Sequence, residues 1–420
     1  MITRKNSRIQ QMPDYEVVVV GAGPAGAMIT KELAERKFSV LCIEKEIEVG
    51  YTNKSTAATP MDTFETFGLP RDVAFEDIMG ARLFGPTENC VIELDEPVGR
   101  VLKFRETKQY LIREAIKSGA HVMVGTEVTD VIKNNGKISG VSYVGPDGKG
   151  KATANVVVDA SGPVGVLSIK LGLWKKRKED LGVAFEYFME NVNPVKSVSE
   201  KGYYMDFFMG SNWAPGGYGW IFPTGPTEAK AGICKLWSAN TPKNELSQRD
   251  YFEKIWKQDP QLKNAQPFEL HECAHYITDP IEKSILDNFL AIGDAINKVH
   301  PIFGEGVRAS FYSARFAAMA IEQARKSKDY SAPKLSLYDK LWDDKWGKNW
   351  KFARQAQKRL YGISDGSLDL LIKKAAKVNP EILLRMYLGT ATTKDRLSLA
   401  AKMPSMIDKK MVGKIIRRFK

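Results

Sequence analysis

The chain has 420 residues and a net charge of +12, with 43% hydrophobic and 27% charged residues. These are globular proportions, and the length suits two domains or one large elaborated domain. The four cysteines show no Cys-x-x-Cys spacing, which argues against a disulfide framework, a zinc site or an iron–sulfur cluster and favours a reducing cytoplasm. The polar, basic start is unlike a secretory signal. Because no run of about 20 apolar residues occurs, we expect no membrane-spanning helix.

The N-terminal elements form a strand–turn–helix–strand unit. Residues 15–20 are a β-branched run that predicts a buried parallel strand. Helix formers follow at 25–36, and residues 39–43 predict a second strand. The turn between the first strand and the helix reads Gly-Ala-Gly-Pro-Ala-Gly, so glycines stand where a strand meets a helix.

Further elements follow in chain order. We expect a helix at 108–118, strands at 122–131, 138–144 and 156–160, aromatic-rich antiparallel strands across 181–275, a strand at 289–293 and a long helix at 306–326. After Ser331 the pattern is nearly all helical, with breaks near Gly362, Pro380, Gly389 and Pro404.

The glycine-rich turn has the spacing of a dinucleotide-binding loop. Gly21 would make the tight turn, Gly23 would let a pyrophosphate approach the backbone, and Gly26 would let the helix pack against the strand. The helix N-terminus around Ala25 would supply N–H groups and positive potential for phosphate. Glu44 closes the second strand, where a carboxylate can accept hydrogen bonds from a ribose diol. The competing interpretation is an ordinary tight turn with a surface glutamate.

Two later segments resemble motifs of flavoprotein hydroxylases and reductases. Residues 156–162 form a strand ending in Ala-Ser-Gly, and residues 291–295 read Ala-Ile-Gly-Asp-Ala. In those proteins the Asp of the second motif binds the ribityl chain of FAD, which the resemblance implies for Asp294. Residues 301–307 open a helix whose N–H groups and dipole could stabilise negative charge on the reduced flavin. No second Gly-x-Gly-x-x-Gly indicates a dedicated NAD domain.

These motifs give one set of candidate FAD-binding residues. The set comprises Gly21, Gly23, Ala25, Gly26, Glu44, Lys45, Arg105, Gly162, Gly293, Asp294, Gly304, Gly306 and Val307. We expect no metal site, because His271 and His275 are four residues apart but no third ligand is evident.

Residues 215–225 carry the most specific motif of the chain. They read Pro-Gly-Gly-Tyr-Gly-Trp-Ile-Phe-Pro-Thr-Gly, which resembles the Tyr-x-Trp-x-Phe-Pro-x-Gly signature of the geranylgeranyl reductase family, within the group that folds like p-hydroxybenzoate hydroxylase. Residues 80–86 are similar to another stretch in archaeal members. The resemblance covers roughly residues 14–330. It implies FAD-dependent reduction of isolated C=C bonds in polyprenyl chains, which in archaea are those of ether phospholipids.

The aromatic residues of this motif are candidates for the wall of a lipid pocket. The substrate-binding candidates are Tyr218, Trp220, Phe222 and Pro223. Trp220 and Phe222 share one face of the expected strand because they are two residues apart. A long apolar pocket beside a flavin would need such walls. The alternative is that these side chains form an ordinary sheet core.

Reduction of an unactivated alkene needs hydride from reduced FAD on one side and a proton donor on the other. His300 is a candidate donor because the ordinary pKa of imidazole lies near neutrality; packing is the alternative role. Tyr218 is a second candidate, and Glu305 could serve only if burial raised its pKa. Family members commonly carry a cysteine–glycine segment after the second strand. Residues 51–58 correspond to it here and place Ser55 near the cysteine position.

The expected fold class is α/β, with a Rossmann-like FAD-binding domain interleaved with a mostly antiparallel substrate domain and followed by a helical region. The expected limits are 1–13 for a flexible tail, 14–180 and 276–330 for the FAD-binding domain, 181–275 for the substrate domain with part of 60–110 on its side, and 331–420 for the helical region.

The C-terminal residues 401–420 carry seven Lys or Arg residues and one Asp. Apolar residues recur every four positions from Ile407 to Phe419, so a helix there would be basic and amphipathic. Such a segment suits peripheral contact with the inner face of the cell membrane; a docked terminal helix is the alternative. No motif indicates nucleic-acid binding. The external reductant stays open between NAD(P)H and a donor protein such as ferredoxin.

Two other functions are compatible with the sequence. An FAD-dependent monooxygenase or halogenase on a hydrophobic substrate would consume oxygen in proportion to product, although no catalytic lysine motif of the halogenase type is evident. A prenyl-lipid carrier resembling the GDP-dissociation inhibitors would share the fold without using the flavin. Glu44 and Asp294 argue against that carrier, since a protein without flavin needs neither.

Overall fold

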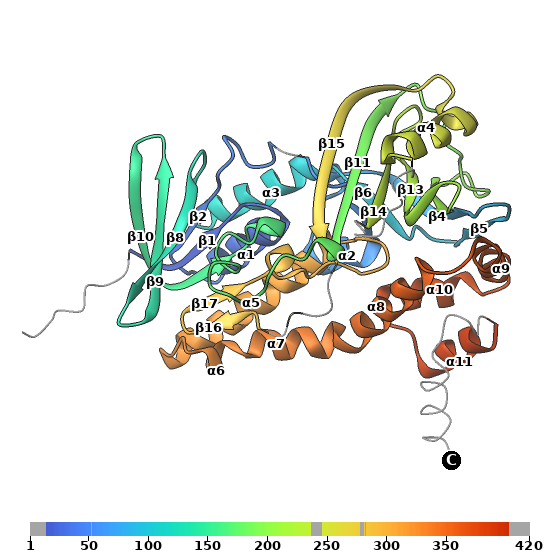
Figure 1. The fold of residues 1–420 in the computed structure, drawn as a ribbon. Coiled ribbons are helices and arrows are strands. Elements are labelled where there is room, and N and C mark those ends of the chain that lie inside the picture. Colours follow the sequence, from blue (N-terminus) through green and yellow to red (C-terminus); the bar gives the residue numbers. More distant parts are fainter. Residues whose placement is uncertain (1–13, 52, 237–245, 278–280, 282, 403–420) are drawn as a thin grey trace, which may run out of the picture.

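A computed structural model describes residues 14–51, 53–236, 246–277, 281 and 283–402. Two β-sheets with their helices lie side by side, and a run of C-terminal helices passes along the lower side of both in the view of Figure 1. None of the helices within these residues is long and apolar enough to cross a membrane.

The first sheet is built on parallel strands. Its main path runs β16-β17-β10-β1-β2-β7, in which only the β16–β17 pair is antiparallel. These strands are β1 (Tyr15–Val20), β2 (Val40–Ile43), β7 (His121–Met123), β10 (Gly148–Asp159), β16 (Ile285–Leu286) and β17 (Phe289–Ala291). Val17, Val18 and Val19 are fully buried, as expected of a strand covered on both faces. The predicted strand–helix–strand unit is confirmed.

Three helices support this sheet. Helix α1 (Pro24–Glu35) packs against both α3 (Phe104–Lys117) and α5 (Val307–Ser327). Buried alanines such as Ala314 and Ala317 on α5 allow close approach, since a small side chain keeps helix axes near one another. The helix expected at 306–326 is thus confirmed within one residue at each end.

An antiparallel extension continues the first sheet. Strands β8 (Glu127–Asn134) and β9 (Lys137–Gly145) pair with each other, and β9 pairs with the first half of β10. The prediction of one strand at 122–131 was wrong, because the chain forms β7 and β8 separately. Gly125 between them has a φ of 61°, a left-handed conformation that interrupts a strand.

The second sheet is mostly antiparallel, as predicted. Its main path is β15-β11-β14-β13-β12-β4-β6-β3, with β5 paired to β4, and β12–β4 is its parallel pair. The strands are β3 (Ala58–Pro60), β4 (Ala74–Phe84), β5 (Asn89–Glu93), β6 (Gly99–Leu102), β11 (Leu181–Glu190), β12 (Tyr203–Gly210), β13 (Ala214–Pro223), β14 (Ala229–Leu236) and β15 (Gln266–Tyr276). Strands from 58–102 therefore belong to this sheet, whereas the domain limits themselves stay a prediction.

The parallel β4–β12 pair is joined by a buried ion pair. Arg82 donates to both carboxylate oxygens of Asp206 at 2.7 and 2.6 Å, and Gln261 donates to the same carboxylate at 2.6 Å. Asp206 is almost fully buried, so three donors compensate the loss of its hydration. Helix α4 (Gln248–Gln258) covers β13 and β14 nearby.

Helices dominate the chain after Ser331, as predicted. They are α6 (Ala332–Leu335), α7 (Leu337–Trp342), a π-helical turn (Asp343–Gly347), α8 (Lys348–Leu360), α9 (Asp365–Ala375), α10 (Pro380–Leu388) and α11 (Thr393–Lys402). The breaks at Gly362, Pro380 and Gly389 are confirmed, while the one near Pro404 lies outside the described residues. The shorter elements are α2 (Met61–Phe67) and 3₁₀ turns at Arg71–Val73, Gly162–Val164, Lys178–Asp180, Pro260–Leu262 and Gly293–Ile296.

The turn from β1 into α1 depends on two glycines. Gly21 has a φ of 94°, and a Cβ there would lie 2.8 Å from the carbonyl oxygen of Ala160. A Cβ on Gly26 would lie 1.8 Å from the carbonyl oxygen of Gly21, which no side chain tolerates. At Gly23, by contrast, a Cβ would meet no described atom within 4 Å, and the φ of −65° suits any residue.

Replacing each of Gly26 and Gly23 by alanine tests which of the two glycines is needed for packing. Gly26→Ala should lower the free energy of unfolding by about 3 kcal/mol or more, because overpacking against fixed backbone is costly. Gly23→Ala should leave the melting temperature of flavin-free protein nearly unchanged, since its Cβ enters open space. Thermal unfolding of both variants checks this, and equal losses for the two would contradict the packing account.

Candidate functional site

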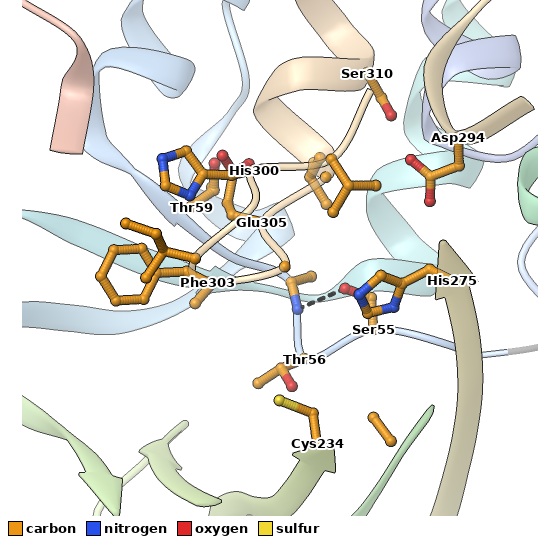
Figure 2. Close-up of a pocket in the computed structure, with 18 of the residues that line it drawn as sticks. Ser55, Thr56, Thr59, Cys234, His275, Asp294, His300, Phe303, Glu305 and Ser310 are labelled. Carbon is orange, nitrogen blue, oxygen red and sulfur yellow. Dashed lines mark hydrogen bonds between the residues drawn. The ribbon is translucent and has the colours of Figure 1, made fainter. Parts of the chain in front are cut away.

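One cavity of about 780 Å³ extends from the β1–α1 turn, past the second sheet, to helices α8, α9 and α10. In the close-up of Figure 2, Asp294 points into it from one side and Cys234 from the other, with Ser55, Thr56 and His275 between them. The cavity therefore brings polar groups of the first sheet and walls of the second sheet into one space.

Most of the predicted site residues line this cavity. Those from the FAD-binding set are Gly21, Gly23, Ala25, Glu44, Lys45, Gly162, Asp294, Gly304, Gly306 and Val307. Those from the catalytic and substrate sets are Ser55, Tyr218, Trp220, Phe222 and His300. Residues separated by nearly 300 positions in the sequence are thus brought to one wall.

Four predicted residues are not among the described residues that line the cavity: Gly26, Arg105, Gly293 and Pro223. Gly26 and Gly293 act through packing, and a Cβ on Gly293 would lie 2.8 Å from the Cβ of Ala25. Arg105 forms an ion pair with Glu48. Pro223 ends strand β13. A direct cofactor or substrate contact of these four stays a prediction.

Glu44 is held in a fixed position at the end of β2. One of its carboxylate oxygens accepts a hydrogen bond from the backbone N–H of Ala22 at 2.6 Å, and the other accepts one from Glu46 at 3.0 Å. The carboxylate thus lies directly beside the glycine-rich turn, where a ribose would meet it. Lys108 of α3 also lines this end of the cavity, and burial lowers its pKa to about 8. Lys108 was not predicted from the sequence, because its position depends on how α3 packs.

The strand end at 156–162 is organised by a buried carboxylate. Asp159 accepts hydrogen bonds from the hydroxyl of Ser161 at 2.6 Å and from the backbone N–H of Ser168 at 2.6 Å. This arrangement fixes the turn that follows β10. Gly162 in that turn has a φ of 68°, and a Cβ there would meet no described atom within 4 Å, so the backbone faces open space in the cavity.

Asp294 carries an unsatisfied carboxylate oxygen. Its Oδ1 is buried and has no hydrogen-bond partner among the described residues. Burial, followed by the neighbouring Glu305 carboxyl, raises the pKa of Asp294 to about 7. A buried acceptor without a donor is costly, so hydroxyl groups of a ligand would bind favourably here by donating hydrogen bonds to this oxygen. This side chain, the glycine-rich turn and Glu44 together fit FAD.

The N-terminus of α5 is partly capped by the chain itself. The carboxylate of Glu305 accepts a hydrogen bond from the backbone N–H of Arg308 at 2.7 Å. Burial raises the pKa of Glu305, although the Arg308 guanidinium opposes this. Gly304 has a φ of 63° and brings the preceding loop against the cavity. The helix therefore presents its remaining N–H groups, with one of them already used by Glu305.

Two of the predicted proton donors lie in unfavourable surroundings. Burial, followed by the Arg308 charge, lowers the pKa of His300 to about 3, so its ring is neutral near pH 7. The ring stacks on Phe303 at a centroid distance of 5.6 Å. Burial raises the pKa of Tyr218 well above its ordinary value, and its hydroxyl donates to the carbonyl of Phe303. Their catalytic roles stay predictions.

Ser55 lies at the centre of the cavity wall. Its hydroxyl accepts a hydrogen bond from the backbone N–H of Ala57 at 3.0 Å, drawn as the dashed line in Figure 2. His275 also lines the cavity, and burial lowers the pKa of that ring to about 4. Ser55 thus shapes its loop, and no group among the described residues accepts a hydrogen bond from its hydroxyl.

A polar group that the sequence analysis missed lies next to Ser55. Thr56, Glu186 and His271 line the cavity and are joined by hydrogen bonds. The available signal was a glutamate in the middle of an aromatic strand, Phe-Glu-Tyr-Phe. Strand register, which a single sequence does not reveal, is needed to place His271 opposite it.

The pKa of Asp294 makes a pH prediction for flavin-free protein. The folded state retains a proton that the unfolded state loses above about pH 4, so stability should fall as the pH rises from about 4 to about 7. Asp294→Asn should flatten that fall. Denaturant unfolding across this range tests it, and parallel pH profiles for the two proteins would contradict it.

The comparisons with known proteins agree with this geometry. A family described as FAD binding domain matches residues 14–323. The digeranylgeranylglycerophospholipid reductase of Haloferax volcanii is 31% identical over 385 residues, which cover 88% of this chain and 91% of that protein. The corresponding protein of Methanocaldococcus jannaschii is 30% identical over 390 residues, covering 90% of this chain and 95% of that protein.

Solved structures show the same fold. A geranylgeranyl bacteriochlorophyll reductase-like protein from Thermoplasma acidophilum has a TM-score of 0.84 at 26% identity, covering 96% of this chain and 99% of that one. A flavin-dependent brominase, with a TM-score of 0.73 at 21% identity, covers 92% of this chain and 98% of its own and shares the fold alone. The chain belongs to the FAD binding domain family and to the digeranylgeranylglycerophospholipid reductase family.

Proposed function

We propose that this protein uses FAD to reduce C=C bonds in the geranylgeranyl chains of membrane ether lipids such as digeranylgeranylglycerophospholipids. The observation that supports the proposal is that the candidate flavin-binding groups and a long apolar wall line one and the same cavity. When bound, FAD supplies hydride for the alkene carbon. The chain's own residues must hold the cofactor, align the prenyl chain and provide a proton.

The C-terminal helices supply much of the apolar wall. They follow the region that matches the FAD binding domain family, which ends at residue 323. Their cavity-lining aliphatic side chains are Leu360, Leu368, Leu371, Ile372, Leu383, Leu384, Met386 and Leu399. A wall of this kind fits a branched hydrocarbon without hydrogen-bonding groups, because it offers burial in place of polar contacts.

The aromatic strand β13 forms the opposite wall. Tyr218, Trp220 and Phe222 alternate along it and all reach the cavity, together with Phe207 of β12, whose ring lies 5.2 Å from that of Phe222. Rigid rings on a strand hold a flexible prenyl chain in one orientation at low entropy cost. Alignment of one double bond against the flavin is what hydride transfer requires.

Membrane contact and the electron donor belong to the proposal as well. A lipid substrate requires access to a bilayer, and the basic segment 401–420 would favour an anionic surface; residues 403–420 lie outside the described residues. The external reductant is NAD(P)H or a protein such as ferredoxin. The protein would then work at the inner face of the cell membrane.

A cavity-filling variant tests the function. Protein reduced with dithionite without oxygen should have its flavin reoxidised by digeranylgeranylglycerophospholipid but not by the saturated lipid. Leu371→Trp should slow this reoxidation about tenfold or more, which corresponds to about 1.4 kcal/mol, because the indole occupies the prenyl path. Stopped-flow absorbance of the flavin measures both rates.

The matched control lies one residue away. Leu370 on the same helix is half exposed and is not among the residues that line the cavity, so Leu370→Trp should leave the rate unchanged. Flavin that ignores the unsaturated lipid and reoxidises only in air would contradict the proposal and favour a monooxygenase or halogenase. Purified protein without any flavin would favour a carrier.

A further inference from the structure

A row of residues crosses four adjacent strands of the second sheet beside the cavity. Strand register pairs Glu186 of β11 with His271 of β15 and with Gly232 of β14, and Gly232 with Trp220 of β13. A Cβ on Gly232 would lie 2.6 Å from the Cβ of Glu186 and 2.7 Å from Cζ2 of Trp220. The glycine therefore leaves room for the carboxylate and the indole to meet over the middle strand.

Hydrogen bonds continue from this row to the cavity and to solvent. Nδ1 of His271 lies 2.9 Å from Oε1 of Glu186, and its Nε2 lies 2.8 Å from Oε2 of Glu269. The other oxygen of Glu186 accepts from the hydroxyl of Thr56 and from Nε1 of Trp220, the latter at 3.3 Å. The side chains of Glu186 and His271 are 4% and 6% exposed, whereas that of Glu269 is 51% exposed.

The hydrogen-bond pattern requires one transferable proton. A neutral imidazole has a single N–H, yet both ring nitrogens of His271 lie within hydrogen-bond distance of a carboxylate oxygen. Either the ring is doubly protonated or one of the two carboxyl groups carries a proton. In every assignment that satisfies both contacts, Glu186, His271 and Glu269 together hold one proton more than a neutral ring between two carboxylates.

Charges around Glu186 keep that proton away from it at rest. Burial raises the pKa of Glu186, but the hydrogen bond from His271, the charge of Lys230 and the hydrogen bond from Thr56 outweigh burial and hold the pKa below its usual range. Lys230 of β14 is fully buried, and its ammonium donates to the backbone carbonyl of Thr56 at 3.3 Å. Glu186 is therefore the acceptor of its hydrogen bonds with His271 and Thr56 at rest.

We propose that the chain of hydrogen bonds from Glu269 through His271 and Glu186 to the hydroxyl of Thr56 is the path that delivers the proton for alkene reduction. The inference rests on the proposed function and names its proton source. Thr56 and Glu186 both line the cavity, and Thr56 points into it in Figure 2. The exposed Glu269 connects the other end to water.

Each alkene reduction consumes one hydride and one proton. Bound reduced FAD would supply the hydride, with its two electrons, to one alkene carbon and would be left oxidised. Glu186 first takes a proton from His271, which reverses the hydrogen bond that Thr56 donates to it at rest. The Thr56 hydroxyl then accepts that proton from Glu186 and gives its own hydrogen to the other alkene carbon. The π bond breaks and two C–H bonds form. Solvent returns the missing proton through Glu269, and the external reductant restores the flavin.

The test uses whole, FAD-loaded protein and the lipid-driven reoxidation described above. Glu186→Gln keeps a side chain of the same shape but cannot pass a proton, and Thr56→Val replaces the hydroxyl by a methyl group of similar size. Each should slow reoxidation about 100-fold or more, within the range of general acid catalysis. Flavin content and reduction by dithionite should stay as in the unchanged protein. A solvent deuterium isotope effect on reoxidation should accompany wild-type turnover.

A matched variant accounts for loss of folding stability. Asp206 is an equally buried, hydrogen-bonded carboxylate of the same sheet that is not among the cavity-lining residues. Asp206→Asn should therefore destabilise the protein but leave the reoxidation rate within about twofold, because proton transfer does not pass through it. If Asp206→Asn and Glu186→Gln slow the reaction equally, the path is wrong and the effect of Glu186 is structural.

A spectroscopic readout tests the path without turnover. The chain has four histidines, so ¹⁵N-labelled imidazoles can be resolved in the oxidised protein. The His271 signal should show two protonated or proton-sharing nitrogens and should change in Glu186→Gln and in Glu269→Gln, while the other three signals stay. An ordinary neutral His271 ring, unaffected by Glu186→Gln, would overturn the path even if the lipid is reduced. Absence of lipid-driven reoxidation in the unchanged protein would instead overturn the proposed function.

Discussion

The contact between Gly26 and the carbonyl of Gly21 is the constraint on which the site depends. Gly26 has no Cβ, and a Cβ would not fit there. The first turn of α1 can therefore pack directly against the end of β1, with its N-terminus directed at the cavity. The same approach brings Ala25 against Gly293, which leads into Asp294. The glycine-rich turn and Asp294, the two parts predicted to bind the phosphates and the ribityl chain of FAD, are therefore positioned by the packing of one helix rather than by two independent loops.

The second requirement is an apolar wall that the FAD-binding fold does not itself provide. Helices after residue 331 supply it by crossing beneath both sheets (Figure 1). Their inward leucines are buried partly against β4, β5 and β12, because Cys90 and Leu368 belong to one buried cluster, with Leu83 and Met209 packed against it. A shared fold can thus host a halogenase or a lipid reductase, since the reacting partner is selected by what covers the flavin.

Site residues could be predicted from the sequence where a functional motif lies at the end of a strand or the start of a helix. Examples are the strand of four valines, the glycine-rich turn and the Asp294 motif. Each consists of neighbouring residues in the chain, so it could be recognised without knowing the fold. Lys108 and the row around Glu186 could not, because their neighbours come from other strands and helices. His271 seemed isolated for the same reason: its two partners include one residue 85 positions away, and only antiparallel register brings them together.

The buried carboxyl groups of the cavity differ in the direction of their pKa shifts. This difference suits a reaction that delivers a hydride from one group and a proton from another. Burial raises the pKa values of Asp294 and Glu305 beside the flavin motifs, so these groups tend toward the neutral form where a reduced, negatively charged flavin would be repelled by carboxylates. The pKa of Glu186, by contrast, is held below its usual range by His271, Lys230 and Thr56, which outweigh burial, so this carboxyl group is ionised. Glu186 can therefore pass a proton from His271 to Thr56 and return to its ionised form. The carboxyl groups that tend toward the neutral form thus lie near the flavin motifs, whereas the carboxylate lies in the proposed proton path.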